Sequence, residues 1–136
     1  MAGVQYVYQT GTGSGGHKEI SKRYYEKGSH TWVMASRLGY ETPVWKTYLN
    51  YLHIGNNARF LMPREWGREP FYTFMARERN EGMGGVNAWT VNNEFITKNK
   101  RWKLGLGYGQ YYVPHPDNYR LNKYGQPSYQ QINASA

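Results

Sequence analysis

The chain has 136 residues, a formal net charge of +8 and no cysteine. Its length is that of a single domain, and without cysteine it has neither a disulfide framework nor a thiolate metal site. The positive charge favours acidic partners. No apolar run reaches the roughly 18 residues of a transmembrane helix. A membrane β-barrel stays possible, because its wall meets lipid with only every second residue.

Alternation of apolar and polar residues predicts six strands along the chain. In the third and fifth strands, Trp45 and Trp102 each begin a face that continues with Leu and Tyr. Lys46 and Lys103 begin the opposite, polar face. Three residues interrupt the alternation: Val7, Ser36 and Asn93. In chain order, the predicted strands cover residues 4–9, 31–41, 45–51, 86–96, 102–108 and 128–136.

The predicted connections alternate between long and short. The short ones lie near Thr42-Pro43 and Lys98-Asn99-Lys100, and the long ones cover 11–30, 55–85 and 114–127. Outer-membrane barrels require this rhythm, because their periplasmic turns are short and their outer loops are long. The pattern alone leaves a membrane wall and a soluble β-fold as equal alternatives.

Tryptophan and tyrosine favour the two interfaces of a membrane, although they are also good strand formers. If the sheet is a membrane wall, the aromatic residues on its apolar face meet lipid. The candidates for this role are Trp32, Tyr40, Trp45, Tyr51, Trp102 and Tyr108.

Basic residues of the polar face and of the long 55–85 connection form a second candidate group. If the polar face lines water, these residues offer donors to anionic solutes, as charged rings do in pores. A loop braced by Arg–Glu ion pairs explains the loop arginines equally well. The candidates are Arg37, Lys46, Arg59, Arg64, Arg68, Arg77, Arg79 and Lys103.

Enzyme motifs are weak in this chain. "GTGSGG" (11–16) matches a dinucleotide fingerprint, but no apolar crossover helix follows it. The histidines lack metal-ligand spacing, and the glutamates of 65–81 each lie within four residues of an arginine. We therefore expect no enzyme, no metal site and no cofactor.

Single-stranded nucleic acid is the main alternative ligand, because basic and aromatic residues together can bind it. A small soluble basic β-protein could use its aromatic and Lys/Arg residues in this way. The best aromatic residues, however, share their face with leucines, and the lysines lie on the other face. We therefore expect no nucleic-acid partner.

Two segments, "RFLMPREWGREPFYTFMARERNEG" (59–82) and "YRLNKYGQPSYQQINASA" (119–136), resemble the C-terminal part of OprD-type porins of Gram-negative bacteria. The resemblance implies an antiparallel up-and-down transmembrane β-barrel of about eighteen strands. It implies passive diffusion of small solutes such as amino acids or peptides, past basic residues. It also implies a place in the outer membrane, contact with its lipids, and folding by the barrel-assembly machinery.

Six strands are too few to close a barrel of that size, because circumference depends on strand number and tilt. We therefore expect residues 1–136 to be a C-terminal segment of such a porin, a partial barrel and not a closed one. The resemblance also implies that an earlier loop builds most of the pore constriction. It therefore gives the loop arginines no fixed place at the narrowest point.

Overall fold

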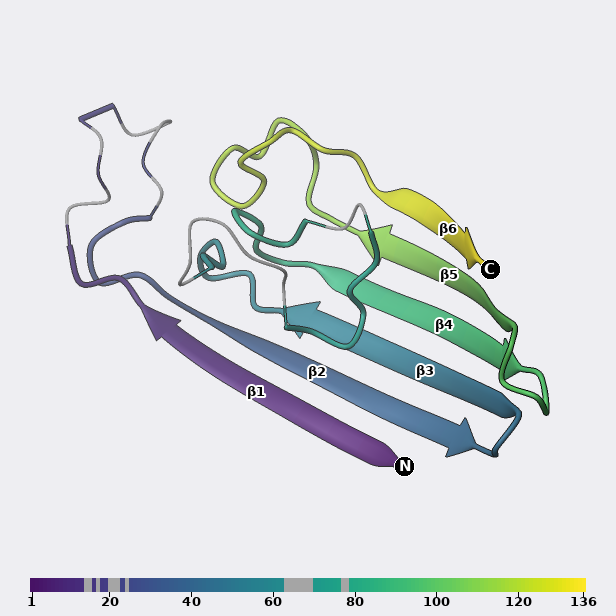
Figure 1. Cartoon of the computed structure of the whole chain (residues 1–136). Coiled ribbons are helices and arrows are strands. Elements are labelled where there is room, and N and C mark those ends of the chain that lie inside the picture. The colour runs from purple at the N-terminus through teal and green to yellow at the C-terminus, as the bar shows by residue number, and fades with distance from the viewer. Residues whose placement is uncertain (14–15, 17, 20–22, 24, 63–69, 77–78) are drawn as a thin grey trace.

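The computed structural model describes residues 1–13, 16, 18–19, 23, 25–62, 70–76 and 79–136. These residues form six strands and no helix, and the strands make one antiparallel sheet in chain order (Figure 1). The predicted all-β, up-and-down arrangement is confirmed, and each predicted strand overlaps an observed one. The strands are β1 (Ala2–Thr10), β2 (His30–Glu41), β3 (Trp45–Ile54), β4 (Asn87–Ile96), β5 (Lys103–Tyr112) and β6 (Tyr129–Ser135).

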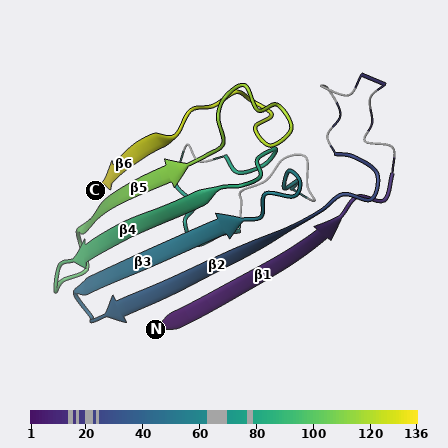
Figure 2. The same cartoon turned by 180° about the vertical axis from the view of Figure 1, so that it is seen from behind.

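The connections divide the sheet into two ends. Short turns join β2 to β3 and β4 to β5, and both chain termini lie at this turn end (Figures 1 and 2). The long connections 11–29, 55–86 and 113–128 leave from the opposite, loop end. The predicted alternation of short and long connections is therefore observed.

The sheet is open. Each strand pairs with its neighbour in the sequence, so β1 and β6 form the two edges. Each edge strand therefore has one side without a strand partner among the described residues. This agrees with the expectation that six strands do not close a barrel.

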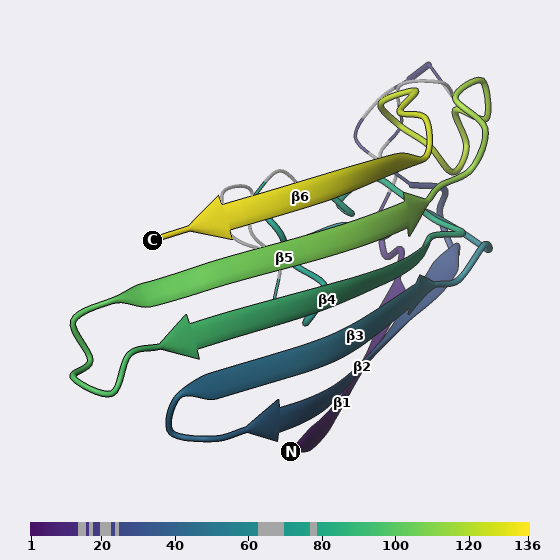
Figure 3. The same cartoon turned by 90° about the vertical axis from the view of Figure 1, so that its right-hand side faces the viewer.

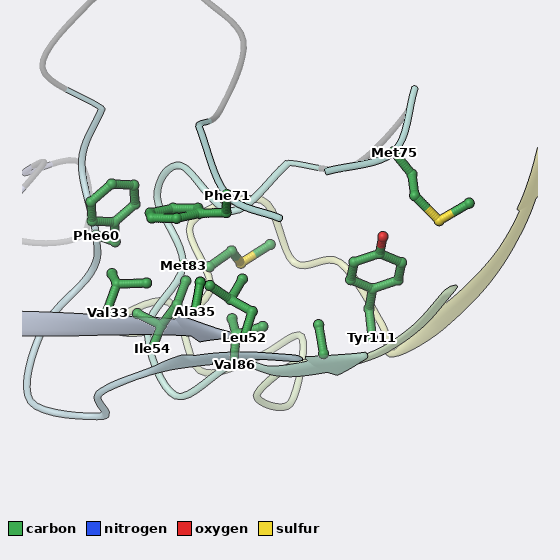
Figure 4. Close-up of a cluster of buried hydrophobic side chains, with 11 residues drawn as sticks. Val33, Ala35, Leu52, Ile54, Phe60, Phe71, Met75, Met83, Val86 and Tyr111 are labelled. Atoms are coloured by element: carbon green, nitrogen blue, oxygen red, sulfur yellow. The ribbon is translucent and has the colours of Figure 1, made fainter. Parts of the chain in front are cut away.

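A hydrophobic core lies on one face of the sheet, in its loop-end half (Figure 4). Figure 3 shows described parts of the 55–86 connection behind the sheet, on this face. The ring centroids of Phe60 and Phe71 are 5.3 Å apart above the strands. Tyr111 of β5 donates its hydroxyl to the Thr73 carbonyl at 2.9 Å. The strands contribute Val33, Ala35, Leu52, Ile54, Ala88 and Tyr111, and the 55–86 connection contributes Phe60, Phe71, Met75, Met83 and Val86.

This core corrects one expectation from the sequence. The whole non-aromatic face was expected to meet water, but the 55–86 connection covers its loop-end half. Val7, which interrupts the predicted alternation, packs against this core. Gly109 lets the connection approach the sheet closely, because a Cβ there would lie 2.6 Å from the Met75 sulfur. Burial of apolar surface holds the connection on the sheet.

Among the described residues, no helix has the length and apolar character needed to cross a membrane.

Candidate functional site

The two faces of the sheet differ in what covers them. We call the face that carries the core the inner face and the opposite one the outer face. Strand alternation places Val33 and Leu52 on the inner face, and Trp32 and Leu49 on the outer face. Exposed large apolar side chains occur on the outer face of every strand: Val4, Tyr6, Tyr8, Met34, Leu38, Tyr40, Trp45, Leu49, Tyr51, Trp89, Phe95, Leu104, Leu106, Tyr112 and Ile132.

An unbroken apolar row crosses the outer face. The strand registers place one apolar or aromatic residue of each strand side by side. Leu38 and Ile132 of this row are 64% and 71% exposed. A soluble protein rarely exposes so large an apolar surface without a partner. The row consists of Ala2, Leu38, Leu49, Val91, Tyr108 and Ile132.

Aromatic side chains lie on both sides of this row. Toward the turn end, the rings of Trp45 and Phe95 are 6.1 Å apart. Toward the loop end, Trp89 lies 5.3 Å from the Tyr108 ring. Trp89 belongs to this group although the sequence analysis did not single it out, and alternation along β4 would have placed it here. All six predicted aromatic residues lie on the outer face or directly before it: Trp32, Tyr40, Trp45, Tyr51, Tyr108 and, preceding β5, Trp102.

Several polar side chains of the outer face are paired within the sheet. Thr47 donates its hydroxyl to the Asn93 side-chain oxygen at 2.8 Å. Gln110 accepts a bond from the Tyr108 hydroxyl at 3.2 Å and donates to the Tyr129 carbonyl at 3.4 Å. Pairing lowers the cost of removing these groups from water.

A polar network occupies the inner face below the core. Arg37 donates from Nε to the Asn50 side-chain oxygen at 2.7 Å. Asn50 in turn donates to the Thr90 hydroxyl at 2.9 Å, and Asn92 donates to the same hydroxyl at 3.3 Å. Because Arg37, Asn50 and Thr90 are register partners on three adjacent strands, the network runs straight across the sheet.

The Arg37 guanidinium lies between two tyrosines. Its carbon is 4.7 Å from the Tyr48 ring centre and 4.6 Å from the Tyr72 ring centre. It also donates to the Tyr72 carbonyl at 3.3 Å. Arg37 therefore connects the sheet to the connection that folds over it. Alternation along the predicted strand 45–51 places Tyr48 on this face, but Tyr72 could not be identified from sequence, because it lies in an irregular segment.

The two lysine candidates on this side of the sheet have acidic neighbours. Lys103 lies 2.7 Å from a Glu94 carboxylate oxygen, and Lys46 lies 4.0 Å from one of Glu41. Within the described part of the chain, Arg37 has no carboxylate in an ion pair. This part of the inner face therefore has little net charge and many amide and hydroxyl groups.

A hollow of about 600 Å³ lies beside this network. It extends over β4, β5 and β6, and its polar lining includes amide, hydroxyl and carboxylate groups. Such groups can replace the hydrogen bonds that a small polar solute makes with water. Its inner-face lining consists of Tyr48, Asn92, Glu94, Gly105, Gly107, Asn133 and Ser135. The lining is completed by Ala76 and by four residues of the outer-face positions: Asn93, Leu106, Ile132 and Ala134.

The two described loop arginines, Arg59 and Arg79, have different surroundings. Arg64, Arg68 and Arg77 lie outside the described residues. Arg59 is only 6% exposed, and its guanidinium donates to the carbonyls of Arg23, Tyr119 and Arg120. Burial lowers the pKa of Arg59, partly opposed by Tyr124 and Glu81. Arg59 therefore joins the connections to each other. The sequence had suggested that it projects over the sheet, and this expectation is wrong.

Arg79 is the remaining described loop candidate. Its guanidinium carbon lies 5.3 Å from the Tyr124 ring centre. The Tyr124 hydroxyl donates to a Glu81 carboxylate oxygen at 2.7 Å. Burial and this hydrogen bond raise the pKa of Tyr124 to about 12. The cluster links the 55–86 and 113–128 connections.

No group of three or more His, Asp or Glu residues that could hold a metal occurs among the described residues.

No protein-family model, curated protein or solved structure matches the chain.

Proposed function

We propose that this chain is a segment of an outer-membrane β-barrel porin that lets small solutes diffuse passively. The outer face would meet the lipid acyl chains, and the inner face would line the aqueous path. Amino acids, short peptides or similar nutrients are the solutes implied by the resemblance of 59–82 and 119–136 to OprD-type porins.

One observation carries this proposal: the apolar row of the outer face, which crosses all six strands without an interruption. At about 25 cal/mol per Å², exposing such a surface to water is costly, and lipid removes the cost. Aromatic residues on both sides of an apolar band are typical of barrel walls. Three polar residues of the outer face, Thr47, Asn93 and Gln110, already have hydrogen-bond partners within the sheet.

The inner face supports the same function. Amide, hydroxyl and carboxylate groups form part of the lining of the hollow of about 600 Å³, together with apolar residues such as Leu106 and Ile132. The charges of Lys46 and Lys103 are largely balanced by glutamates. Water and small polar solutes are compatible with such a lining. The inward fold of the 55–86 connection would narrow the path at its loop end.

The open edges define what the complete barrel needs. An unpaired strand edge is very unfavourable in lipid, because its N–H and C=O groups lose their hydrogen bonds to water. Pairing of β1 and β6 with further strands, from the same protein or from other copies, is therefore part of the proposal.

The nucleic-acid alternative loses its main support. Stacking on bases requires aromatic rings and cations on one surface. Within the strands these groups are separated, because Trp45 and Trp89 lie on the outer face, whereas Arg37 and Lys46 lie on the inner face. Trp102 has basic neighbours at the turn 97–102, but a single ring does not form a stacking surface. No second function is therefore proposed.

The test is reconstitution of the full chain into vesicles. We expect the chain to aggregate without detergent, to enter phosphatidylcholine vesicles as β-sheet, and to resist extraction by alkaline carbonate. Vesicles in which the sheet edges are paired should swell in isotonic solutions of small amino acids but not of large dextrans. A chain that stays monomeric in buffer without detergent and does not bind to vesicles would overturn the proposal.

A further inference from the structure

The turn between β4 and β5 has a concentration of positive charge. Residues 97–102 include Lys98, Lys100 and Arg101, all exposed. Among the described residues, no carboxylate forms an ion pair with any of the three, whereas the adjacent Lys103 is paired with Glu94 at 2.7 Å. The other short turn, at residues 42–44, contains no charged residue. The charge is therefore a property of this turn and not of short turns in general.

The backbone of this turn is fixed by its uncharged residues. Thr97 donates its hydroxyl to the Asn99 side-chain oxygen at 2.6 Å and accepts a bond from the Trp102 amide at 3.1 Å. Asn99 also accepts a bond from the Arg101 amide at 3.2 Å. The three basic side chains take no part in these contacts, so they can be replaced without loss of the turn.

Lys100 occupies a position that does not favour lysine. Its φ of 55° is positive, and no other non-glycine residue among those described has a positive φ. Glycine or asparagine adopts this conformation more readily. The backbone conformation therefore does not explain why residue 100 is a lysine. A function of the side-chain charge would explain it.

Apolar aromatic residues lie directly beside the charge. Trp102 is 64% exposed, and two residues further along the outer face Leu104 is the register partner of Phe95. Phe95 contacts Trp45. Cations beside interfacial tryptophans match the boundary of a membrane, where phosphate groups adjoin acyl chains.

We propose that the turn at 97–102 binds the headgroups of anionic phospholipids, with Trp102 and Trp45 at the boundary of the acyl chains. This inference rests on the proposed function, which places the outer face in lipid. The ammonium and guanidinium groups would bind the phosphates by charge-assisted hydrogen bonds. Each basic residue near an anionic surface strengthens binding severalfold.

The experiment measures partitioning of the full chain between buffer and vesicles, of phosphatidylcholine alone or mixed with phosphatidylglycerol. The triple variant Lys98→Gln, Lys100→Gln, Arg101→Gln should lose about 10- to 100-fold of the preference for anionic vesicles. Its binding to phosphatidylcholine and its circular dichroism should stay unchanged. High salt should reduce the preference of the unmodified chain.

Two control variants separate a site from general charge attraction. Lys18→Gln, Lys27→Gln, Arg120→Gln removes the same charge at the loop end and should keep most of the preference. Lys98→Arg, Lys100→Arg, Arg101→Lys keeps the charge of the turn and should keep the preference as well. Equal losses in the two glutamine variants would overturn the inference, because net charge would then suffice.

The remaining outcomes are equally decisive. Equal binding of the unmodified chain to both vesicle types would overturn the lipid site and leave the porin proposal standing. No binding to either vesicle type would overturn both. If inorganic phosphate competes at the same concentration as lipid phosphate, the turn is a phosphate site and the commitment to lipid is wrong.

Discussion

Leu49 and Leu52 lie three residues apart in β3, and their surroundings differ completely. Leu49 is 50% exposed on the outer face, whereas Leu52 is fully buried on the inner face under the 55–86 connection. The chain therefore covers one of its apolar surfaces itself and leaves the other uncovered. The exposed surface is continuous across the six strands. In the proposed function, the lipid acyl chains cover it.

The comparison also separates two sources of stability. Packing on the inner face comes from within the chain and should hold in any solvent that keeps it folded. Burial on the outer face depends on what surrounds the sheet. Substitutions on the two faces should therefore respond differently when water or detergent is replaced by lipid.

The largest effect is expected in the core. Leu52→Ala leaves a cavity beneath the 55–86 connection and should lower the free energy of unfolding by about 2–5 kcal/mol. Urea titration in detergent micelles and in vesicles measures this loss, which should be the same in both. Leu49→Ala is the matched control and should cost less, since no protein side chains close over it. An equal loss for both leucines would mean that the faces are equally packed.

A charge on the outer face tests the surroundings of that face. Ile132→Arg should make folding into vesicles less favourable by about 2–4 kcal/mol, the cost of an arginine facing lipid near the bilayer centre. Urea titration of vesicle-bound protein measures the change. Ile132 is 71% exposed, so the same substitution in a water-soluble sheet should be nearly neutral.

The adjacent inner-face residue provides the control for this charge. Strand alternation places Asn133 on the inner face, so Asn133→Arg should change folding into vesicles by less than about 1 kcal/mol. If the two arginine variants behave alike, the faces do not differ in their contact with lipid, and the outer face has another partner.

The six strands and their connections could be predicted because alternation and connection lengths depend on local sequence. The core could not. Phe60, Phe71 and Met75 lie in an irregular segment, whose path depends on contacts with strands distant in sequence. One signal was present in the sequence. Val33, Ala35, Leu52 and Ile54 are apolar residues at inner-face positions, where a face that meets only water would carry polar ones. Val7 gave the same signal.

A smaller effect is expected where the 55–86 connection meets the polar network. Arg37→Gln removes the guanidinium between Tyr48 and Tyr72 and should cost about 1–2 kcal/mol. Hydrogen exchange at residues 70–76 should accelerate together with this loss. Lys46→Gln, which removes a looser ion pair of 4.0 Å, should leave that exchange unchanged. Unchanged exchange in the Arg37 variant would show that the core alone holds the connection.

The candidate site was only partly accessible from sequence. Arg37 could be placed on the polar face by alternation. Its partner Tyr72 could not, because nothing local brings residue 72 over β2. Arg59 looked equivalent to the other loop arginines, but three backbone carbonyls from distant segments bind its guanidinium. Long-range contacts of this kind decide whether an arginine is structural or free to meet a solute.

The smallest effect concerns pH at the contact between the 55–86 and 113–128 connections. The pKa of Tyr124 is raised from 10.0 to about 12, so folding favours the protonated phenol. This contribution to stability is complete below pH 10 and is lost as the pH rises toward 12. Unfolding titrations over this range should show the loss in the unmodified chain and a smaller one in Tyr124→Phe. Identical profiles would mean that Tyr124 does not report on this contact.

Cysteine labelling tests the central claim most directly, because the chain has no cysteine of its own. Single variants Leu49→Cys and Ile132→Cys place a thiol on the outer face, and Asn92→Cys and Asn133→Cys place one on the inner face. In vesicles treated with a water-soluble maleimide, we expect the two inner-face thiols to react and the two outer-face thiols to be protected. Rapid labelling of Leu49→Cys and Ile132→Cys would contradict an outer face in contact with lipid.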